Sequence, residues 1–293
     1  MKGFIALSHE PKGVSFWLLA IAGGLIALQL HLAQRLTYGG YNLEACLFWL
    51  AALSIAWRRR HTLNLDSDVA STSIGLILIG WILLRSLLID YDGGDILIRV
   101  SPLISAVALC LLASGVSRIQ QYWRELSIVC LSAFPVEHLL ARLGAFIDVY
   151  PPLLDAKVSA YLLWYLGFDA TQQGVYVSLP TGAIEIYGPC SSFGMMFYLW
   201  QFSAVFLLTF PLSRNRGIVL VVLSTLMALI VNGVRLSLLA VIVSHQDQAG
   251  FAYWHGSSGA QIFSTVAVLL FGCLCSVLMK DTQSREDNLG ETS

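Results

Sequence analysis

The sequence predicts an all-α polytopic membrane protein, and its composition and apolar stretches carry this prediction. Apolar residues make up 57% of the 293 residues, charged residues make up 12%, and the mean hydropathy is +0.72. Because an ordinary soluble domain is about 25% charged, this chain has too few charged side chains to cover a water-exposed surface. A helix needs about 20 mostly apolar residues to cross the hydrocarbon core. The apolar stretches therefore predict about eight spans, at roughly 14–34, 42–57, 70–90, 98–115, 124–143, 190–211, 217–243 and 257–279.

Basic residues predict the orientation of these spans, since lysine and arginine are enriched on the cytoplasmic side. The run 58–60 follows the second span, and Arg214 and Arg216 follow the sixth, which places both connections inside. Both chain termini are then cytoplasmic. The first span also has an alternative interpretation as a signal peptide, because Lys2 and Lys12 precede its apolar run.

One connection differs from the short loops elsewhere. Residues 144–189 form the longest polar-containing segment and lie outside the cytoplasm in this topology. Within it, 153–167 is apolar and aromatic enough to form a short helix along the interface. Alternating apolar residues over 175–187, interrupted by Pro180-Thr181-Gly182, predict a small β-hairpin before the sixth span. Residues 1–280 are thus expected to form a single integral-membrane domain, and the polar tail 281–293 is expected to be disordered.

Composition also excludes several function classes. The net charge of −1 provides no basic surface for nucleic acid. The cysteines are scattered and predict neither a disulfide framework nor a zinc site, and no cofactor is indicated. They are Cys46, Cys110, Cys130, Cys190, Cys273 and Cys275. All except Cys190 fall inside apolar runs.

Three side chains are predicted to share one depth at the outer edge of the membrane. Counted at about 1.5 Å per residue from the cytoplasmic basic residues, the distances are about 36 Å for Cys190, about 29 Å for Arg235 and about 38 Å for His255. The hydrocarbon core is about 30 Å thick. Each residue taken alone has an ordinary interpretation, as core cysteine, snorkelling arginine or interface histidine. Their joint placement on the last three spans is what indicates a site.

These residue types are the components of a thiol nucleophile. A helix N-terminus and a neighbouring imidazole both favour the thiolate, so Cys190 is the candidate nucleophile and His255 the candidate acid-base residue. The guanidinium of Arg235 suits a carboxylate or a developing oxyanion. Supporting roles are predicted for Asn232, which shares a helix face with Arg235, for the hydroxyls of Ser191 and Ser192 as helix caps, and for Glu137 and His138 as a second acid-base pair.

The segments Gly188-Pro189-Cys190-Ser191-Ser192, Asn232-Gly233-Val234-Arg235 and His255-Gly256 with Gly259 resemble the exosortase/archaeosortase family of membrane-embedded sorting enzymes. The resemblance is specific over about 175–272. Many exosortases read Cys-Ser-Gly where this chain reads Cys190-Ser191-Ser192, and this departure favours a subgroup, for which the cyanobacterial one is the candidate.

The resemblance implies a cysteine peptidase or transpeptidase in the bacterial plasma membrane, with Cys190, Arg235 and His255 as its catalytic residues. It implies exported protein substrates whose C-terminal sorting signal combines a Pro-Glu-Pro-type motif, one transmembrane helix and a basic cluster. Cleavage would pass through a thioester, which an unknown acceptor or water resolves. Membrane lipid is the other expected partner.

Two alternatives from other classes remain open. A transporter could use Arg235 and His255 to handle an anion or protons, although the inverted repeats typical of such proteins are not evident. A quinone-linked thiol oxidase needs a pair of outward cysteines, and only Cys190 is predicted to face out.

Overall fold

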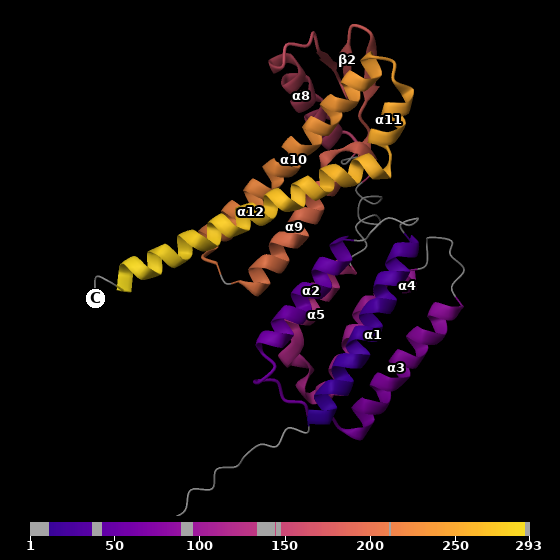
Figure 1. The fold of residues 1–293 in the computed structure, drawn as a ribbon, viewed down its shortest axis with the longest axis vertical. Helices are drawn as coiled ribbons and strands as arrows, with labels where there is room; N and C mark the ends of the chain where they lie inside the picture. Colours follow the sequence, from indigo (N-terminus) through magenta and orange to yellow (C-terminus); the bar gives the residue numbers. More distant parts are fainter. Residues whose placement is uncertain are drawn as a thin grey trace, which may run out of the picture. The chain divides into compact units, whose positions relative to one another are not determined.

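The computed structural model describes residues 12–36, 43–88, 96–133, 144, 148–210 and 212–290. These belong to two compact units, Met1–Phe134 and Pro135–Ser293. The single integral-membrane domain expected from the sequence stays a prediction. Each unit has its own internal packing (Figure 1). The predicted residues Glu137 and His138 lie outside the described part of the chain.

The first unit is helical throughout its described residues. It contains α1 (Lys12–Leu36), α2 (Leu43–Arg58), α3 (Val69–Leu87), α4 (Ile96–Ser114), the 3-10 helix η1 (Val116–Tyr122) and α5 (Trp123–Ser132). Buried polar side chains join α1 to α4: Gln29 donates to Ser105 at 2.9 Å and accepts from Ser101 at 2.7 Å. An apolar interior provides no water for such groups, so this pairing stabilises the packing of the two helices.

The second unit consists of long helices with a small mixed layer at one end. Its elements are α8 (Tyr150–Tyr165), β1 (Thr171–Gln173), β2 (Tyr176–Leu179), β3 (Gly182–Glu185), η2 (Gly188–Cys190), α9 (Ser192–Thr209), α10 (Arg214–Ser244), α11 (Gln248–His255) and α12 (Ser257–Gly290). In Figure 1, α8, the sheet and α11 gather around the C-terminal end of α10 and the start of α12. We call α8, the sheet and α11 together the mixed layer. The helix α12 continues to Gly290, whereas the polar composition predicts a disordered tail from residue 281 onward. An existing helix gains one hydrogen bond for each residue it adds, which favours this continuation.

The predicted hairpin is present and is part of a three-stranded antiparallel sheet in the order β1-β2-β3. Val177 pairs with Ile184, and Leu179 pairs with Gly182. Of the apolar side chains in the predicted alternation, four are buried and Val175 is half-buried; the buried ones are Val177, Leu179, Ile184 and Ile186. They pack with Leu163 of α8 and with α10 residues in one apolar cluster. The strand β1 was not predicted, since three polar residues carry no alternation to detect.

Among the described residues, four or five helices are long and apolar enough to cross a membrane. Four described helices qualify: Val69–Leu87, Ser192–Thr209, Arg214–Ser244 and Ser257–Lys280. The bent pair Val100–Ser114 and Val116–Ser132, with 119° between its helices, makes a fifth if it is one span. Apolar helices over Phe16–Leu32 and Cys46–Arg58 are shorter. The protein is therefore a multi-pass membrane protein, while eight spans stays a prediction.

The length of α10 explains how the mixed layer is held. Its 31 residues extend about 46 Å at 1.5 Å per residue, which is longer than a hydrocarbon core of about 30 Å. The part of α10 that exceeds this thickness, at its C-terminal end, contacts α8, β2, β3 and α11. Gly233 makes the approach of α8 possible, because a Cβ atom there would lie 2.7 Å from Cγ1 of Val158.

We predict that Gly233→Ala destabilises the second unit through this contact. The added methyl group would overpack against Val158 and cost about 1–3 kcal/mol. The measurement is the thermal unfolding midpoint of the purified protein in detergent. Gly272→Ala on α12 is the matched control, since its Cβ would meet no atom within 4 Å.

The double variant Gly233→Ala/Val158→Ala is expected to recover much of the loss, because residues in contact do not contribute independently. Destabilisation of the double variant equal to the sum of the two single effects would contradict the close approach.

Candidate functional site

The structure brings together the cysteine, histidine and arginine that the sequence singles out. The sulfur of Cys190 lies 3.4 Å from Nε2 of His255. A guanidinium nitrogen of Arg235, Nη2, donates to the main-chain oxygen of His255 at 3.4 Å. The three residues come from η2, α11 and α10, which are separated by as many as 65 positions along the chain. A thiol–imidazole contact next to a cation is therefore a property of the tertiary fold.

Local backbone structure presents Cys190 at this position. The helix η2 ends at Cys190, whose N–H donates to the oxygen of Tyr187 at 2.9 Å. The side chain of Cys190 is only 7% exposed. The helix α9 begins two residues later, at Ser192, so the thiol lies next to a helix N-terminus. The thiol therefore lies between an imidazole and the N-terminus of α9.

Stacking orients the imidazole of His255. Its ring lies 5.0 Å from the ring of Phe251, and their planes differ by 14°. These residues are four apart on α11, the spacing at which helical side chains meet. His255 is the last residue of α11, and the chain then turns into α12. Gly259 permits this turn, because a Cβ there would lie 2.6 Å from the oxygen of Trp254.

Arg235 retains a donor for which the described residues provide no acceptor. Its Nε is buried and has no hydrogen-bond partner among the described residues. Burying a guanidinium N–H without an acceptor costs free energy. One N–H of the guanidinium is therefore unsatisfied within the described part of the chain, and a donor of this kind suits an anionic or carbonyl oxygen.

The residues for which supporting roles are predicted make different kinds of contact in the structure. Asn232 is 1% exposed and donates through Nδ2 to the main-chain oxygen of Cys190 at 3.1 Å, so it supports the thiol's backbone. The prediction that serine hydroxyls cap the helix is wrong. The hydroxyl of Ser191 donates backward to the oxygen of Gly188 at 2.7 Å, and the buried hydroxyl of Ser192 has no hydrogen-bond partner in the described part of the chain.

A carboxyl group from another helix takes the capping role instead. The N–H of Ser192 donates to Oδ2 of Asp155 at 2.7 Å. Asp155 lies on α8 with 0% exposure, and burial raises the pKa of its carboxyl, an effect opposed by the groups of Ser192 and Asn232 that face it. Sequence reasoning missed this residue. The available signal was one acidic residue within the apolar helix predicted for 153–167.

Tyr187 is a second residue at the site that was not predicted. A hydrogen bond with Cys190 raises the pKa of its phenol, the charge of the same cysteine acts in the same direction, and Arg235 opposes the shift. The side chain is 48% exposed. A neutral phenol beside the sulfur can donate a hydrogen bond to a bound group. The alternation predicted for 175–187 already put Tyr187 opposite the buried face of the hairpin.

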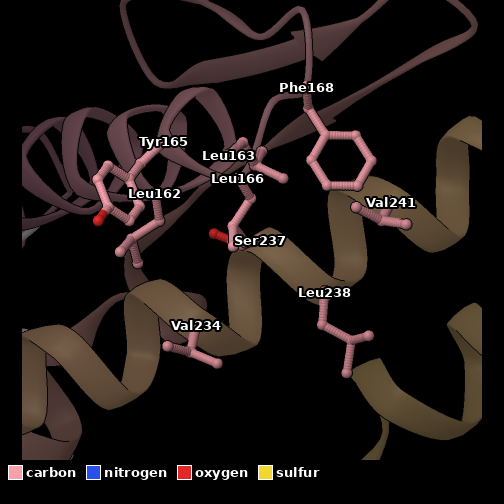
Figure 2. Close-up of a pocket in the computed structure, with 9 residues that line it drawn as sticks. All are labelled: Leu162, Leu163, Tyr165, Leu166, Phe168, Val234, Ser237, Leu238 and Val241. Atoms are coloured by element: carbon pink, nitrogen blue, oxygen red, sulfur yellow. The ribbon is translucent and has the colours of Figure 1, made fainter.

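A separate apolar groove lies next to the site, between α8 and α10. It has a volume of about 430 Å³ and is lined by residues such as Tyr165, Phe168, Val234 and Leu238 (Figure 2). None of Cys190, Arg235 and His255 lines it. Among the described residues, no group of three or more histidine, cysteine, aspartate or glutamate residues is placed to hold a metal ion.

The fold and the site define a multi-pass membrane protein in which a thiol before α9, a guanidinium on α10 and an imidazole at the end of α11 lie together. Comparison with protein-family models matches residues 40–272 to the family described as transmembrane exosortase (Exosortase_EpsH). The chain belongs to this transmembrane exosortase family. Among curated proteins and among solved structures, no match was found.

We predict that His255→Gln slows alkylation of Cys190 by about tenfold at pH 7, because the thiol loses the neighbouring base 3.4 Å away. The measurement uses a variant in which the other five cysteines are replaced, with the rate followed by mass spectrometry. His245→Gln is the matched control, since His245 is exposed and its Nδ1 contacts the oxygen of Val241 at 2.8 Å. Equal rates in the two glutamine variants would refute the coupling.

Proposed function

We propose that this protein is a cysteine peptidase or transpeptidase that cleaves C-terminal sorting signals of exported proteins at the membrane surface. The observation that carries the proposal is the 3.4 Å contact between the sulfur of Cys190 and Nε2 of His255, with Arg235 bonded to the same histidine. Membership of the transmembrane exosortase family supports a sorting role. A thiol paired with a base is the arrangement that activates a cysteine for covalent catalysis.

In the proposed mechanism, His255 takes the thiol proton and the sulfur of Cys190 attacks the carbonyl carbon of the scissile peptide bond. The tetrahedral oxyanion receives hydrogen bonds from Arg235, whose Nε has no acceptor among the described residues. His255 then returns the proton to the leaving amine as the carbon–nitrogen bond breaks. The product is a thioester on Cys190 and a free C-terminal fragment.

The second half of the reaction regenerates the thiol. An amine or hydroxyl acceptor attacks the thioester carbonyl, His255 removes its proton, and the sulfur leaves as the thiolate. Transfer to such an acceptor gives transpeptidation, and attack by water gives hydrolysis. Both outcomes use the same residues.

The site is proposed to lie on the extracytoplasmic side of the plasma membrane. Arg214 and Arg216 begin α10, and Arg235 lies about 29 Å further along the helix axis from Arg216, close to the thickness of the hydrocarbon core. Basic residues at the N-terminal end of α10 favour a cytoplasmic position for that end. Both chain termini are then cytoplasmic.

The proposed substrate is an exported protein whose C-terminal signal has a Pro-Glu-Pro-type motif, one apolar helix and a basic cluster, as the family implies. A protein tethered by one membrane helix presents the adjoining peptide at the bilayer surface. Cys190 adjoins the N-terminus of α9, a candidate span, and so has a matching depth.

We predict that Cys190→Ala abolishes processing of a reporter protein carrying such a signal, because Cys190 is the proposed nucleophile. The reporter is coexpressed with each variant and its size is followed on a gel. Cys273→Ala on α12 is the matched control and should leave processing intact, since Cys273 lies 18 residues beyond His255.

Full processing by Cys190→Ala would eliminate the thiol mechanism. The transporter alternative makes a different prediction, namely solute or ion flux in vesicles that survives loss of Cys190 and disappears in Arg235→Ala.

Replacing the guanidinium tests the oxyanion role. We predict that Arg235→Lys lowers kcat by about 100- to 1,000-fold with little change in KM, because a lysine cannot reproduce the directed N–H donors. Steady-state kinetics on a fluorogenic peptide in detergent micelles give both constants. A rise in KM at unchanged kcat would instead assign Arg235 to ground-state binding.

A further inference from the structure

The buried carboxyl of Asp155 has no place in the proposed chemistry, yet it lies directly behind the nucleophile. It is 0% exposed, and its Oδ1 has no hydrogen-bond partner among the described residues. Removing a carboxyl group from water costs several kcal/mol unless hydrogen bonds replace the lost solvent. A half-satisfied carboxyl in this position is therefore poorly explained by stability alone.

The partners of Asp155 all belong to the site. Its Oδ2 accepts the N–H of Ser192 at 2.7 Å, which anchors the first turn of α9. The side chain of Asn232 faces the same carboxyl and also donates to the main-chain oxygen of Cys190 at 3.1 Å. One carboxyl on α8 thus holds the main chain that follows the thiol at two points, directly at Ser192 and through Asn232 at the carbonyl of Cys190.

We propose that Asp155 is a positioning residue, which fixes the Cys190 main chain so that the sulfur faces Nε2 of His255. This inference rests on the proposed thiol mechanism. The residue touches neither the sulfur nor the imidazole in any described contact and acts through Ser192 and Asn232. A displacement of about 1 Å at a reacting group can cost about 100-fold in rate.

If Asp155 acted on Cys190 through its charge, its removal would change the alkylation rate in the opposite direction from the loss of a positioning role. A negative charge at the N-terminus of α9 disfavours a second negative charge on Cys190, so removing it would speed alkylation of the thiol. Loss of positioning would move the sulfur away from His255 and slow the same reaction. Alkylation therefore distinguishes the two roles by its direction.

The experiment compares Asp155→Leu, Asp155→Asn and Ser159→Ala in the full-length protein. Ser159 is the matched control, because it is also fully buried on α8 and also links α8 to α10, through a hydroxyl contact with Ser237 at 3.1 Å. Each variant is measured for kcat, for KM, for its thermal midpoint, and for alkylation of Cys190 by iodoacetamide at pH 7 with the other five cysteines replaced.

We expect Asp155→Leu to lower kcat by about 100-fold at unchanged KM and to slow alkylation by about tenfold. Asp155→Asn should fall between it and the reference protein, since an amide oxygen still accepts the N–H of Ser192. Ser159→Ala should keep both rates near those of the reference protein. If Asp155→Leu fails to accumulate in membranes, the comparison of Asp155→Asn with Ser159→Ala tests the positioning role instead.

Alkylation in the leucine variant at or above the reference rate would overturn the positioning role, as would an equal loss of kcat in Ser159→Ala. Failure of the proposed function gives a different result. The reference protein would then cleave no reporter, while the alkylation rates would still rank the variants.

Discussion

The contact between the sulfur of Cys190 and the imidazole of His255 is the interaction on which the site depends, and no single element can make it. The thiol is placed by the junction of η2 and α9, and the imidazole by the junction of α11 and α12. Both junctions lie against the C-terminal end of α10, which also contributes Arg235 and Asn232. The long helix α10 therefore serves as the common support for these side chains.

Close packing around α10 keeps these junctions fixed. The sheet and α8 share one apolar cluster with Leu236 and Leu239 of α10, so the mixed layer cannot shift without exposing that cluster. At two positions a glycine lets neighbouring elements approach closely, because it has no side chain. Gly233 admits Val158 of α8, and Gly259 admits the backbone of Trp254 before α12. Both glycines fall within the segments that carry the family resemblance.

The sequence alone predicted that three side chains share one depth and that a hairpin precedes α9, because both predictions follow from local regularities. Depth along a helix depends only on counting at about 1.5 Å per residue, so Cys190, Arg235 and His255 could be assigned to one plane. Alternation over 175–187 gave the buried face of the sheet, with Val177 and Ile184 inward.

The contacts of Asp155 and Tyr187 could not be predicted in this way. Asp155 lies 35 positions before Cys190, and nothing in the composition of α8 indicates that one of its residues caps α9. The same limit explains the wrong capping prediction for Ser191 and Ser192. A hydroxyl near a helix start is the usual cap, and only the tertiary fold supplies a stronger acceptor.

The thioester on Cys190 can be tested most directly by intercepting it with a strong external nucleophile. Substrate is incubated with the purified protein in the presence of hydroxylamine, and the N-terminal product is identified by mass spectrometry. We expect a product that ends in a hydroxamate, in proportion to the hydroxylamine added, and none with Cys190→Ala. A product that ends only in a free carboxyl group at every hydroxylamine concentration, formed at the usual rate, would contradict a covalent intermediate on this cysteine.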